Sequence, residues 1–494
     1  MPTLPPLSEA WQPLPPAAWD SAAARHLLRR AGWTARPADV ARAQQDGLEA
    51  TLARLFPETP ALLAKPASIT QLESELPALT EQTRSATGPE RQRLQKDLRE
   101  RAASTLQDLS LAWLDHASTA GHEAAAKWTA FLSDIYVVSQ EKVKQTGLIY
   151  AHQDILIRHG LGRAPALTKA ISRSPAMIVY LDLQDSRRDA PNENFARELF
   201  ELFTLGEGNY SEADIKEAAR AFTGYRQRLG EVRVAPQQAD KGSKTIFGRS
   251  GRFDGDDVID LVYEQPAAAT FLPRELVRFY LTDTALPADY LTALGDAWRR
   301  SNFDLRRLAL QFFGSRLFFA SEFRGTLIKS PLQFYLGLIQ DLDLQIAPLP
   351  RQVLGPLRQM GQMLYQPPNV RGWVGGRSWI NSSTFAARRQ VVQGFFSPLN
   401  EALLNADDVR ALNAARATGR TRFVVSDAML TDFAALTPAE FATRVAAQFL
   451  PVSVDAAYLE AIRDFATADG NARSTDRVRA AIAAILQSPE YQLC

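Results

Sequence analysis

The sequence predicts a mainly α-helical protein of many helices, in an orthogonal or bundle-like arrangement, with one small β-hairpin insertion near residues 225–248. Apolar residues recur at three- and four-residue steps along most of the chain, which is the period of an amphipathic helix. Residues 225–234 instead show two short runs around a Leu-Gly pair, a pattern typical of a hairpin. A chain of 494 residues, 46% of them hydrophobic, can form more than one core, because single cores stop growing near about 250–300 residues.

We expect three regions: an N-terminal helical region over 1–125, a central core over 126–395, and an alanine-rich helical region over 396–494. In the first region, residues 18–56 predict two short helices. The spacing then predicts a long amphipathic helix over 80–120 with a charged outer face, typical of a scaffold helix or an antiparallel arm. Its apolar positions include Leu94, Leu98, Ala102, Leu106 and Leu109.

Helical periodicity continues through the central region, with two interruptions. The first is the hairpin at 225–234 and the glycine- and charge-rich loop that follows it to 255. The second is a loop rich in proline, glycine and tryptophan at 366–379. Helices are expected at 127–160, 165–180, 194–205, 211–222, 256–262, 267–280, 287–301, 304–313 and 352–363.

Charge and cysteine content exclude several classes of function. With 56 Lys and Arg against 55 Asp and Glu, the net charge is +1, so no long-range field attracts nucleic acid or anionic lipid. An apolar run of about 18 residues, the minimum for a membrane span, is absent from the sequence. The one cysteine, Cys494, excludes an internal disulfide and a cysteine metal cage. The start of the chain lacks the features of a signal peptide, which predicts a cytoplasmic protein.

A polar strip on an otherwise apolar helix is the richest chemical feature. Between Pro191 and Gly206, the residues Asn194, Arg197, Glu198 and Glu201 share one face at about 100° per residue. Charges there must face water, pair internally or line a cleft. In one interpretation Arg197 pairs with Glu201 and Glu198 is solvated. In the other, Glu198 and Glu201 are catalytic acid/base groups or metal ligands, oriented by Asn194 and Arg197.

Two further loops carry candidate binding residues. Asp240 and Lys244 lie in a segment that superficially resembles a phosphate-binding loop but lacks its first glycine, so we expect only a loop near the polar strip. Asn369, Arg371 and Trp373 follow two prolines and flank Gly372, on a stiff loop suited to binding; packing of Trp373 in the core is the alternative. Ser211 and Asp214 are placed as a helix capping box.

These segments together resemble the domain of unknown function 1800 family. The resemblance is carried by Asn192 to Leu199, Glu201 to Gly206, Ala219 to Gly224 and Pro367 to Trp373. Further matches are His26 to Arg30, Gly242, Lys244, Gly248, Gly361 with Gln362, and Ser488 to Gln492. The resemblance covers nearly the whole chain.

The resemblance implies a helical bacterial protein without a settled activity. Relatives commonly carry export signals, so a periplasmic or exported location is the alternative to the cytoplasm, and a sulfatase-like protein of a neighbouring family is an implied partner. Relatives also place histidines where this chain has Ser133-Asp134-Ile135, Ala239 and Gln265. If those histidines bind metal or move protons, this member has lost that chemistry.

We therefore favour a binding or accessory protein with a polar cleft around Glu198 and Glu201. The alternative is a hydrolase-like enzyme that acts by carboxylate acid/base chemistry on a polar or carbohydrate-like substrate. In either case Asn194, Arg197, Asp240, Lys244, Asn369, Arg371 and Trp373 are the expected binding residues. The sequence leaves any metal, any cofactor and the reaction type undetermined.

Overall fold

The computed structural model describes residues 4–467 and 475–494, and it confirms the mainly α-helical class. Near the N-terminus, the two short helices predicted within 18–56 are α2 and α3. The side chain of Asp20 starts α2 by accepting a hydrogen bond from the Ala23 N–H at 2.8 Å. The helices of this part are α1 (Leu7–Ala10), α2 (Ser21–Ala31) and α3 (Pro37–Leu55).

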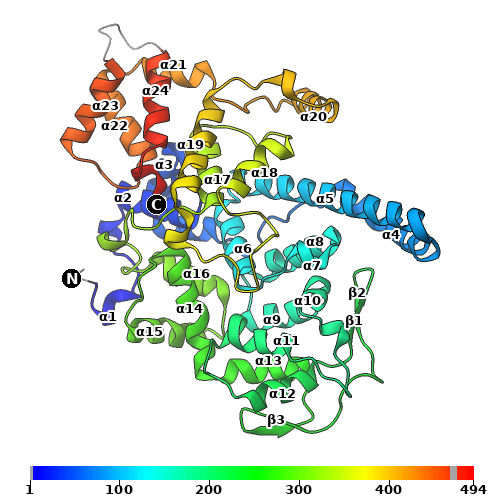
Figure 1. Ribbon diagram of the computed structural model, residues 1–494. Helices are drawn as coiled ribbons and strands as arrows, with labels where there is room; N and C mark the ends of the chain where they lie inside the picture. The colour runs from blue at the N-terminus through cyan, green and yellow to red at the C-terminus, as the bar shows by residue number, and fades with distance from the viewer. Residues whose placement is uncertain (1–3, 468–474) are drawn as a thin grey trace.

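A long arm of two antiparallel helices, α4 (Ala67–Ser85) and α5 (Gly88–Ser118), projects from one side of the molecule (Figure 1). The helix predicted over 80–120 therefore begins at Gly88. The outer part of the arm is polar and solvated, whereas the inner part of α5 buries Leu109, Trp113 and Leu114 in the core. The arm is anchored at its inner end because the apolar residues of α5 are concentrated there.

The central helices surround α6, which lies in the middle of the molecule (Figure 1). Short loops join most of them. They are α6 (Glu123–Ile135), α7 (Gln140–Val143), α8 (Thr146–His159), α9 (Ala164–Ser172), α10 (Pro175–Tyr180), α11 (Asn194–Glu198), α12 (Glu212–Ala221), α13 (Gly255–Glu264), α14 (Pro266–Tyr280), α15 (Ala288–Arg300) and α16 (Leu305–Gly314).

Within the described residues, two antiparallel hairpins occur where one was predicted. The expected hairpin consists of β1 (Tyr225–Arg228) and β2 (Glu231–Val234), joined by Leu229 and Gly230 at positive φ. The second consists of β3 (Lys244–Ile246) and β4 (Arg249–Gly251) and was expected to be loop. Phe247 and Gly248 join its strands, and both have positive φ, as the two central residues of a tight hairpin turn often do. Phe247 is an atypical residue for that conformation.

Helices continue to the end of the described chain: α17 (Pro331–Asp341), α18 (Pro350–Gln359), α19 (Ser382–Phe396), α20 (Ala406–Ala417), α21 (Asp427–Ala434), α22 (Pro438–Phe449), α23 (Ala456–Thr467) and α24 (Thr475–Leu486). Buried apolar side chains from Ala10 to Tyr491 form one large cluster. The division at residues 125 and 395 stays a prediction. Within the described residues, every helix is too short or too polar to cross a membrane.

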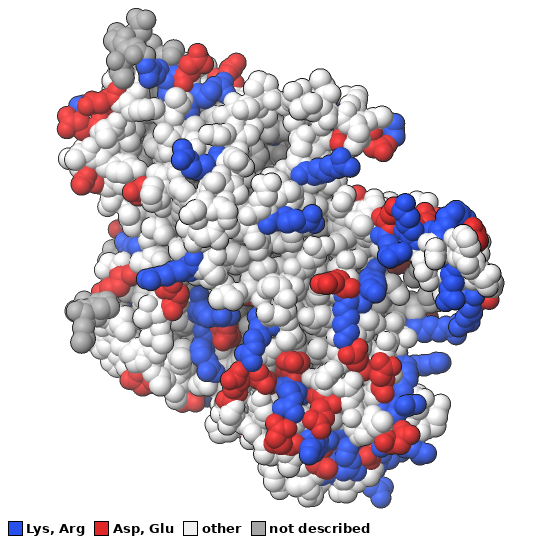
Figure 2. Space-filling view, viewed as in Figure 1, with Lys and Arg blue, Asp and Glu red and all other residues white. Residues whose placement is uncertain are grey.

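The two ends of the chain contribute to this core. His26 and Arg30 on α2 reach the segments around Phe318 and Tyr280, and Tyr491 donates a hydrogen bond to Asp341 on α17 at 2.8 Å. Charged side chains of both signs gather over the β1–β4 part and the α4–α5 arm, whereas the middle of the same face is mostly uncharged (Figure 2).

Candidate functional site

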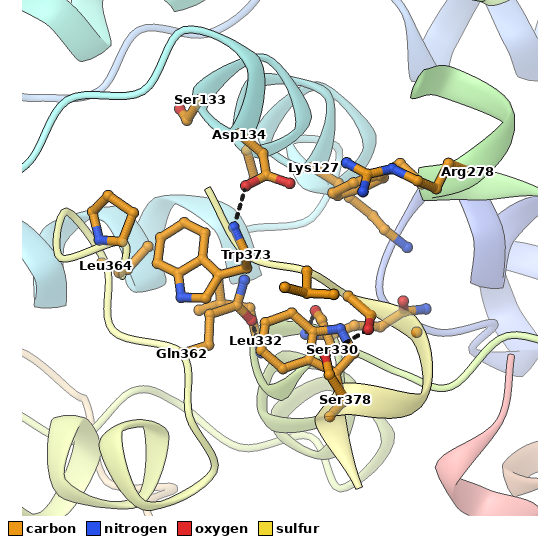
Figure 3. A pocket seen from close by; sticks show the side chains of 18 of the residues that line it. Lys127, Ser133, Asp134, Arg278, Ser330, Leu332, Gln362, Leu364, Trp373 and Ser378 are labelled. Carbon is orange, nitrogen blue, oxygen red and sulfur yellow. Dashed lines mark hydrogen bonds between the residues drawn. The ribbon is translucent and has the colours of Figure 1, made fainter. Parts of the chain in front are cut away.

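A cavity of about 430 Å³ lies beside α6, where segments far apart in the sequence meet. Its walls come from the end of α2, α5, α6, α8, the end of α14, the start of α17 and the loop over residues 362–379. Four tryptophans, Trp33, Trp113, Trp373 and Trp379, line it. Figure 3 shows Ser133 and Asp134 projecting from one side and Ser330 and Ser378 from the other.

The tryptophans on the α2 and α5 side are fixed by packing. Trp33 donates its indole N–H to the Ala117 carbonyl oxygen at 2.7 Å. Its ring meets Trp113 edge to face, with ring centroids 6.3 Å apart, an arrangement favoured by the charge distribution of aromatic rings. This wall of the cavity is therefore preformed and rigid.

The opposite wall is the proline-rich loop, which Asp134 holds in place. The Trp373 backbone N–H donates to Asp134 Oδ1 at 2.9 Å (Figure 3). Gly372 allows this approach, because its φ is +73° and a Cβ there would lie 2.1 Å from Asp134 Oδ1. Burial raises the pKa of Asp134 to about 6. Trp373, predicted as a binding residue, thus lines the cavity.

Arg371 joins this loop to the polar strip. Its Nη2 contacts Glu201 Oε1 at 2.7 Å and Glu207 Oε1 at 2.8 Å. Tyr210 donates its hydroxyl to the other Glu201 oxygen at 2.9 Å. The Glu201 side chain is 18% exposed, so this carboxylate is held by two neighbours instead of pointing freely into water.

The helix that carries the strip changes geometry at Leu199–Thr204, where it forms a π-helical turn. The Leu205 and Gly206 N–H groups both donate to the Phe200 carbonyl oxygen, at 2.8 and 3.0 Å. The predicted regular helix over 194–205 is therefore only partly right. A wider turn after Glu198 alters the regular 100° spacing on which the predicted strip was based.

The predicted ion pair between Arg197 and Glu201 is wrong. Arg197 instead pairs with Glu193 at 3.2 Å and with Glu212 at 2.8 Å. Glu212 reaches Arg197 because the Ser211–Asp214 capping box, confirmed here, starts α12 beside α11. Glu201 is left to pair with Arg371.

Glu198 forms no ion pair with a described residue, but its carboxyl is influenced by the charges of Glu201 and Arg371. Burial, and then the negative charge of Glu201, raise the pKa of the Glu198 carboxyl, while Arg371 opposes that rise. Asn194 is exposed, and its backbone N–H donates to Asn192 Oδ1 at 2.9 Å. The catalytic role of Glu198 and Glu201 stays a prediction.

Asp240, Lys244 and Asn369 hold their own loops together. Asp240 accepts a hydrogen bond from Arg220 Nε at 2.8 Å, and the buried Lys244 ammonium donates to the backbone oxygens of Asp240 and Gly242 at 2.9 and 3.0 Å. Asn369 Oδ1 accepts the Arg371 N–H at 2.8 Å. Of the predicted residues, the structure joins Arg371 with Glu201 and Asn369, and Asp240 with Lys244. The binding roles of all of them stay predictions.

The cavity also contains polar residues that the sequence did not single out. Lys127 on α6 donates to the backbone oxygens of Arg30 and Gly32 at 2.8 and 2.9 Å, and burial lowers the pKa of its ammonium to about 7. Lys127 follows the ordinary helical pattern and gave no signal. Asp134 lies in the segment where the family resemblance implies a histidine, and that was the one available signal.

His152 on α8 is fixed as a neutral ring in the cavity wall. Its Nε2–H donates to the Tyr136 carbonyl oxygen at 2.9 Å, and the Ser174 hydroxyl donates to Nδ1 at 2.9 Å. A carbonyl only accepts, so the proton is on Nε2. Burial lowers the pKa of His152 to about 4.

The lowered pKa of His152 predicts a pH-dependent stability. Below about pH 6.5 the His152 ring binds a proton in the unfolded chain but not in the folded chain. The free energy of unfolding therefore falls as the pH is lowered from 6.5 toward 4, by about 3 kcal/mol at most. We expect His152→Gln to flatten this loss. Urea unfolding of both proteins between pH 4 and 7 measures it, and parallel curves would contradict it.

Within the described residues, His, Cys, Asp and Glu side chains form no cluster of three or more that is suited to hold a metal ion. A family profile described as "Protein of unknown function (DUF1800)" matches residues 26–493, a range that includes all four tryptophans of the cavity. No curated protein and no solved structure matches the chain.

Proposed function

The chain belongs to the DUF1800 family, whose function is unknown, and from this premise we propose that it binds a small organic molecule in the cavity beside α6. The proposal rests mainly on the four tryptophans that line a cavity of about 430 Å³ together with other apolar and polar side chains. Binding sites of proteins have this character: they are concave, mostly apolar, largely preformed and about 300–1,000 Å³ in volume.

The polar strip supports the cavity in this proposal. Glu201 and Glu207 hold Arg371, and two residues later Trp373 enters the cavity wall. The loop between Pro367 and Trp373 is stiff, because proline restricts its own φ and that of its neighbour. The ion pairs of Arg371 therefore hold the loop next to the residue that enters the cavity wall.

A blocked cavity tests the proposal. Ser378 is exposed at the cavity and donates its hydroxyl to the Gly375 carbonyl oxygen at 2.6 Å. We expect Ser378→Trp to fill the entrance without unfolding the protein. After incubation with an extract of the native host, mass spectrometry should detect a small molecule retained by the wild type and lost, at least tenfold, in the variant.

Ser397→Trp is the matched control. Ser397 is also exposed and bonds to a nearby backbone oxygen, that of Gln393 at 2.9 Å, but it lies outside the cavity. It should retain the molecule. Retention of nothing by the wild type, or equal retention by Ser378→Trp, would refute the proposed function.

Glu198 supports a second candidate, the hydrolase-like enzyme with carboxylate acid/base chemistry on a polar or carbohydrate-like substrate. Its raised pKa beside a second carboxylate is typical of a general acid. If a hydrolytic activity is found, Glu198→Gln should abolish it and leave the melting temperature unchanged. The sulfatase-like partner and the location of the protein stay predictions from the family resemblance.

A further inference from the structure

Free polar atoms in the cavity wall indicate the chemistry of its ligand, provided that the proposed function holds. Gln362 is 8% exposed; its Oε1 accepts the Leu332 N–H at 3.0 Å, while its amide nitrogen donates to no described residue. The indole N–H groups of Trp373 and Trp379 likewise lack acceptors among the described residues. Figure 3 shows Gln362 and Leu332 near Trp373.

The same wall offers a free acceptor. Asp134 Oδ1 accepts the Trp373 N–H, but Oδ2 forms no hydrogen bond or ion pair with a described residue. A ligand that satisfies both the free donors and this acceptor must itself accept and donate. Hydroxyl groups do both, whereas a carboxylate only accepts and an ammonium group only donates.

Charge favours a neutral ligand. His152 in the cavity wall is neutral, and the lysine, arginine and aspartate side chains there are three bases, Lys127, Arg278 and Arg377, and two acids, Asp134 and Asp283. Lys127 already donates to two backbone oxygens, and Arg278 pairs with Glu275 at 2.9 Å. Because these charges nearly balance, a strongly charged ligand would bring an uncompensated charge into a partly desolvated cavity, which costs free energy.

The tryptophans favour a ring with apolar faces. Their indole faces take flat apolar surfaces, and their N–H groups at the ring edge take acceptors. A pyranose ring with equatorial hydroxyl groups has this form, because its C–H bonds make two apolar faces and its hydroxyl groups form a polar rim. A volume of about 430 Å³ is sufficient for more than one such ring.

We propose that the cavity binds a neutral saccharide of roughly two pyranose rings, which packs against Trp373 and Trp379 and whose hydroxyl groups bond to Asp134 and Gln362. Asp134 then has two functions: one carboxylate oxygen holds the loop and the other accepts a sugar hydroxyl. Because charged acceptors form stronger hydrogen bonds than neutral ones, Asp134 contributes most of the polar affinity.

Asp134→Asn separates these two functions. The asparagine oxygen can still accept the Trp373 N–H, so the loop stays in place, but the charged acceptor for the sugar is lost. We expect cellobiose, titrated into the full chain and followed by ligand-observed NMR and tryptophan fluorescence, to bind the wild type. Asp134→Asn should weaken that binding at least tenfold at an unchanged melting temperature.

Asp432→Asn on α21 makes the same chemical change at an exposed position outside the cavity and should bind cellobiose like the wild type. Maltose and the neutral apolar dye N-phenyl-1-naphthylamine complete the test. One outcome is that the wild type binds the dye, the Ser378→Trp variant does not, and neither sugar binds. The saccharide proposal is then refuted and the proposed function stands. If dye and sugars all fail to bind, the cavity itself is not a binding site.

Discussion

Arg30→Met is expected to lower the free energy of unfolding by about 4 kcal/mol, the largest effect of any substitution considered. Arg30 is 1% exposed on α2. Its guanidinium donates to the backbone oxygens of Tyr280 and Leu281, both at 3.0 Å, and to that of Phe323. Methionine fills a similar volume but leaves the buried carbonyl groups of Tyr280 and Leu281 unpaired, at about 1–3 kcal/mol each. The Phe323 oxygen keeps the hydrogen bond from the Thr326 hydroxyl at 2.9 Å.

The expected loss of unfolding free energy is smaller than the summed contributions of the three hydrogen bonds that Arg30 donates to backbone oxygens. Burial of the guanidinium costs free energy in the wild type, and methionine removes that cost. That cost is visible in the pKa of Arg30, which burial lowers. Arg30→Lys should recover only part of the stability, since an ammonium lacks the planar fork that reaches several carbonyl groups at once. Equilibrium urea unfolding measures both variants. Arg91→Met, at an exposed position of α5, is the control, and coincident curves for Arg30→Met and Arg91→Met would contradict the prediction.

Gly372→Ala is expected to lower the free energy of unfolding by about 3 kcal/mol and to abolish binding in the cavity. A non-glycine residue at a φ of +73° costs about 1 kcal/mol. The new Cβ would also lie 2.1 Å from Asp134 Oδ1 and 3.0 Å from the Asp134 backbone oxygen. The loop must then move, and it loses the hydrogen bond from the Trp373 N–H to Asp134.

Gly419→Ala is the matched control for that substitution. Gly419 has a φ of +82°, and a Cβ there meets nothing within 4 Å. Gly419→Ala should lower the free energy of unfolding only by the conformational cost of positive φ, about 1 kcal/mol. The difference between the two variants in urea unfolding therefore measures the contact with Asp134. Equal losses, or unchanged ligand retention by Gly372→Ala, would show that the loop does not depend on this approach.

Local features of the fold were predictable because short segments determine them. The Leu229-Gly230 turn and the Ser211–Asp214 capping box both agree with the structure. Each depends on a few neighbouring residues whose preferences do not need the rest of the chain. The second hairpin was missed because Phe247 occupies a turn position that seldom takes a bulky side chain.

The site was predictable only in part. Trp373 and Arg371 were expected on a rigid binding loop, and the structure places Trp373 in the cavity wall and Arg371 on Glu201. The regular spacing of the strip was misjudged, since a π-helical turn has no distinct pattern in a single sequence. Asp134 and Lys127 looked like ordinary helix residues.

By itself, the sequence determined the helical class, the family and the stiffness of the loop before Trp373, because periodicity, motifs and prolines are properties of contiguous residues. The tertiary structure alone decided that Trp33, Asp134, Gln362 and Trp379 share one cavity. Such contacts join residues hundreds of positions apart, and they form only when the apolar faces of several helices are buried together. The tertiary structure also decided how carboxylates and arginines pair, because the pairing depends on how α11, α12 and the loop that carries Arg371 pack against one another.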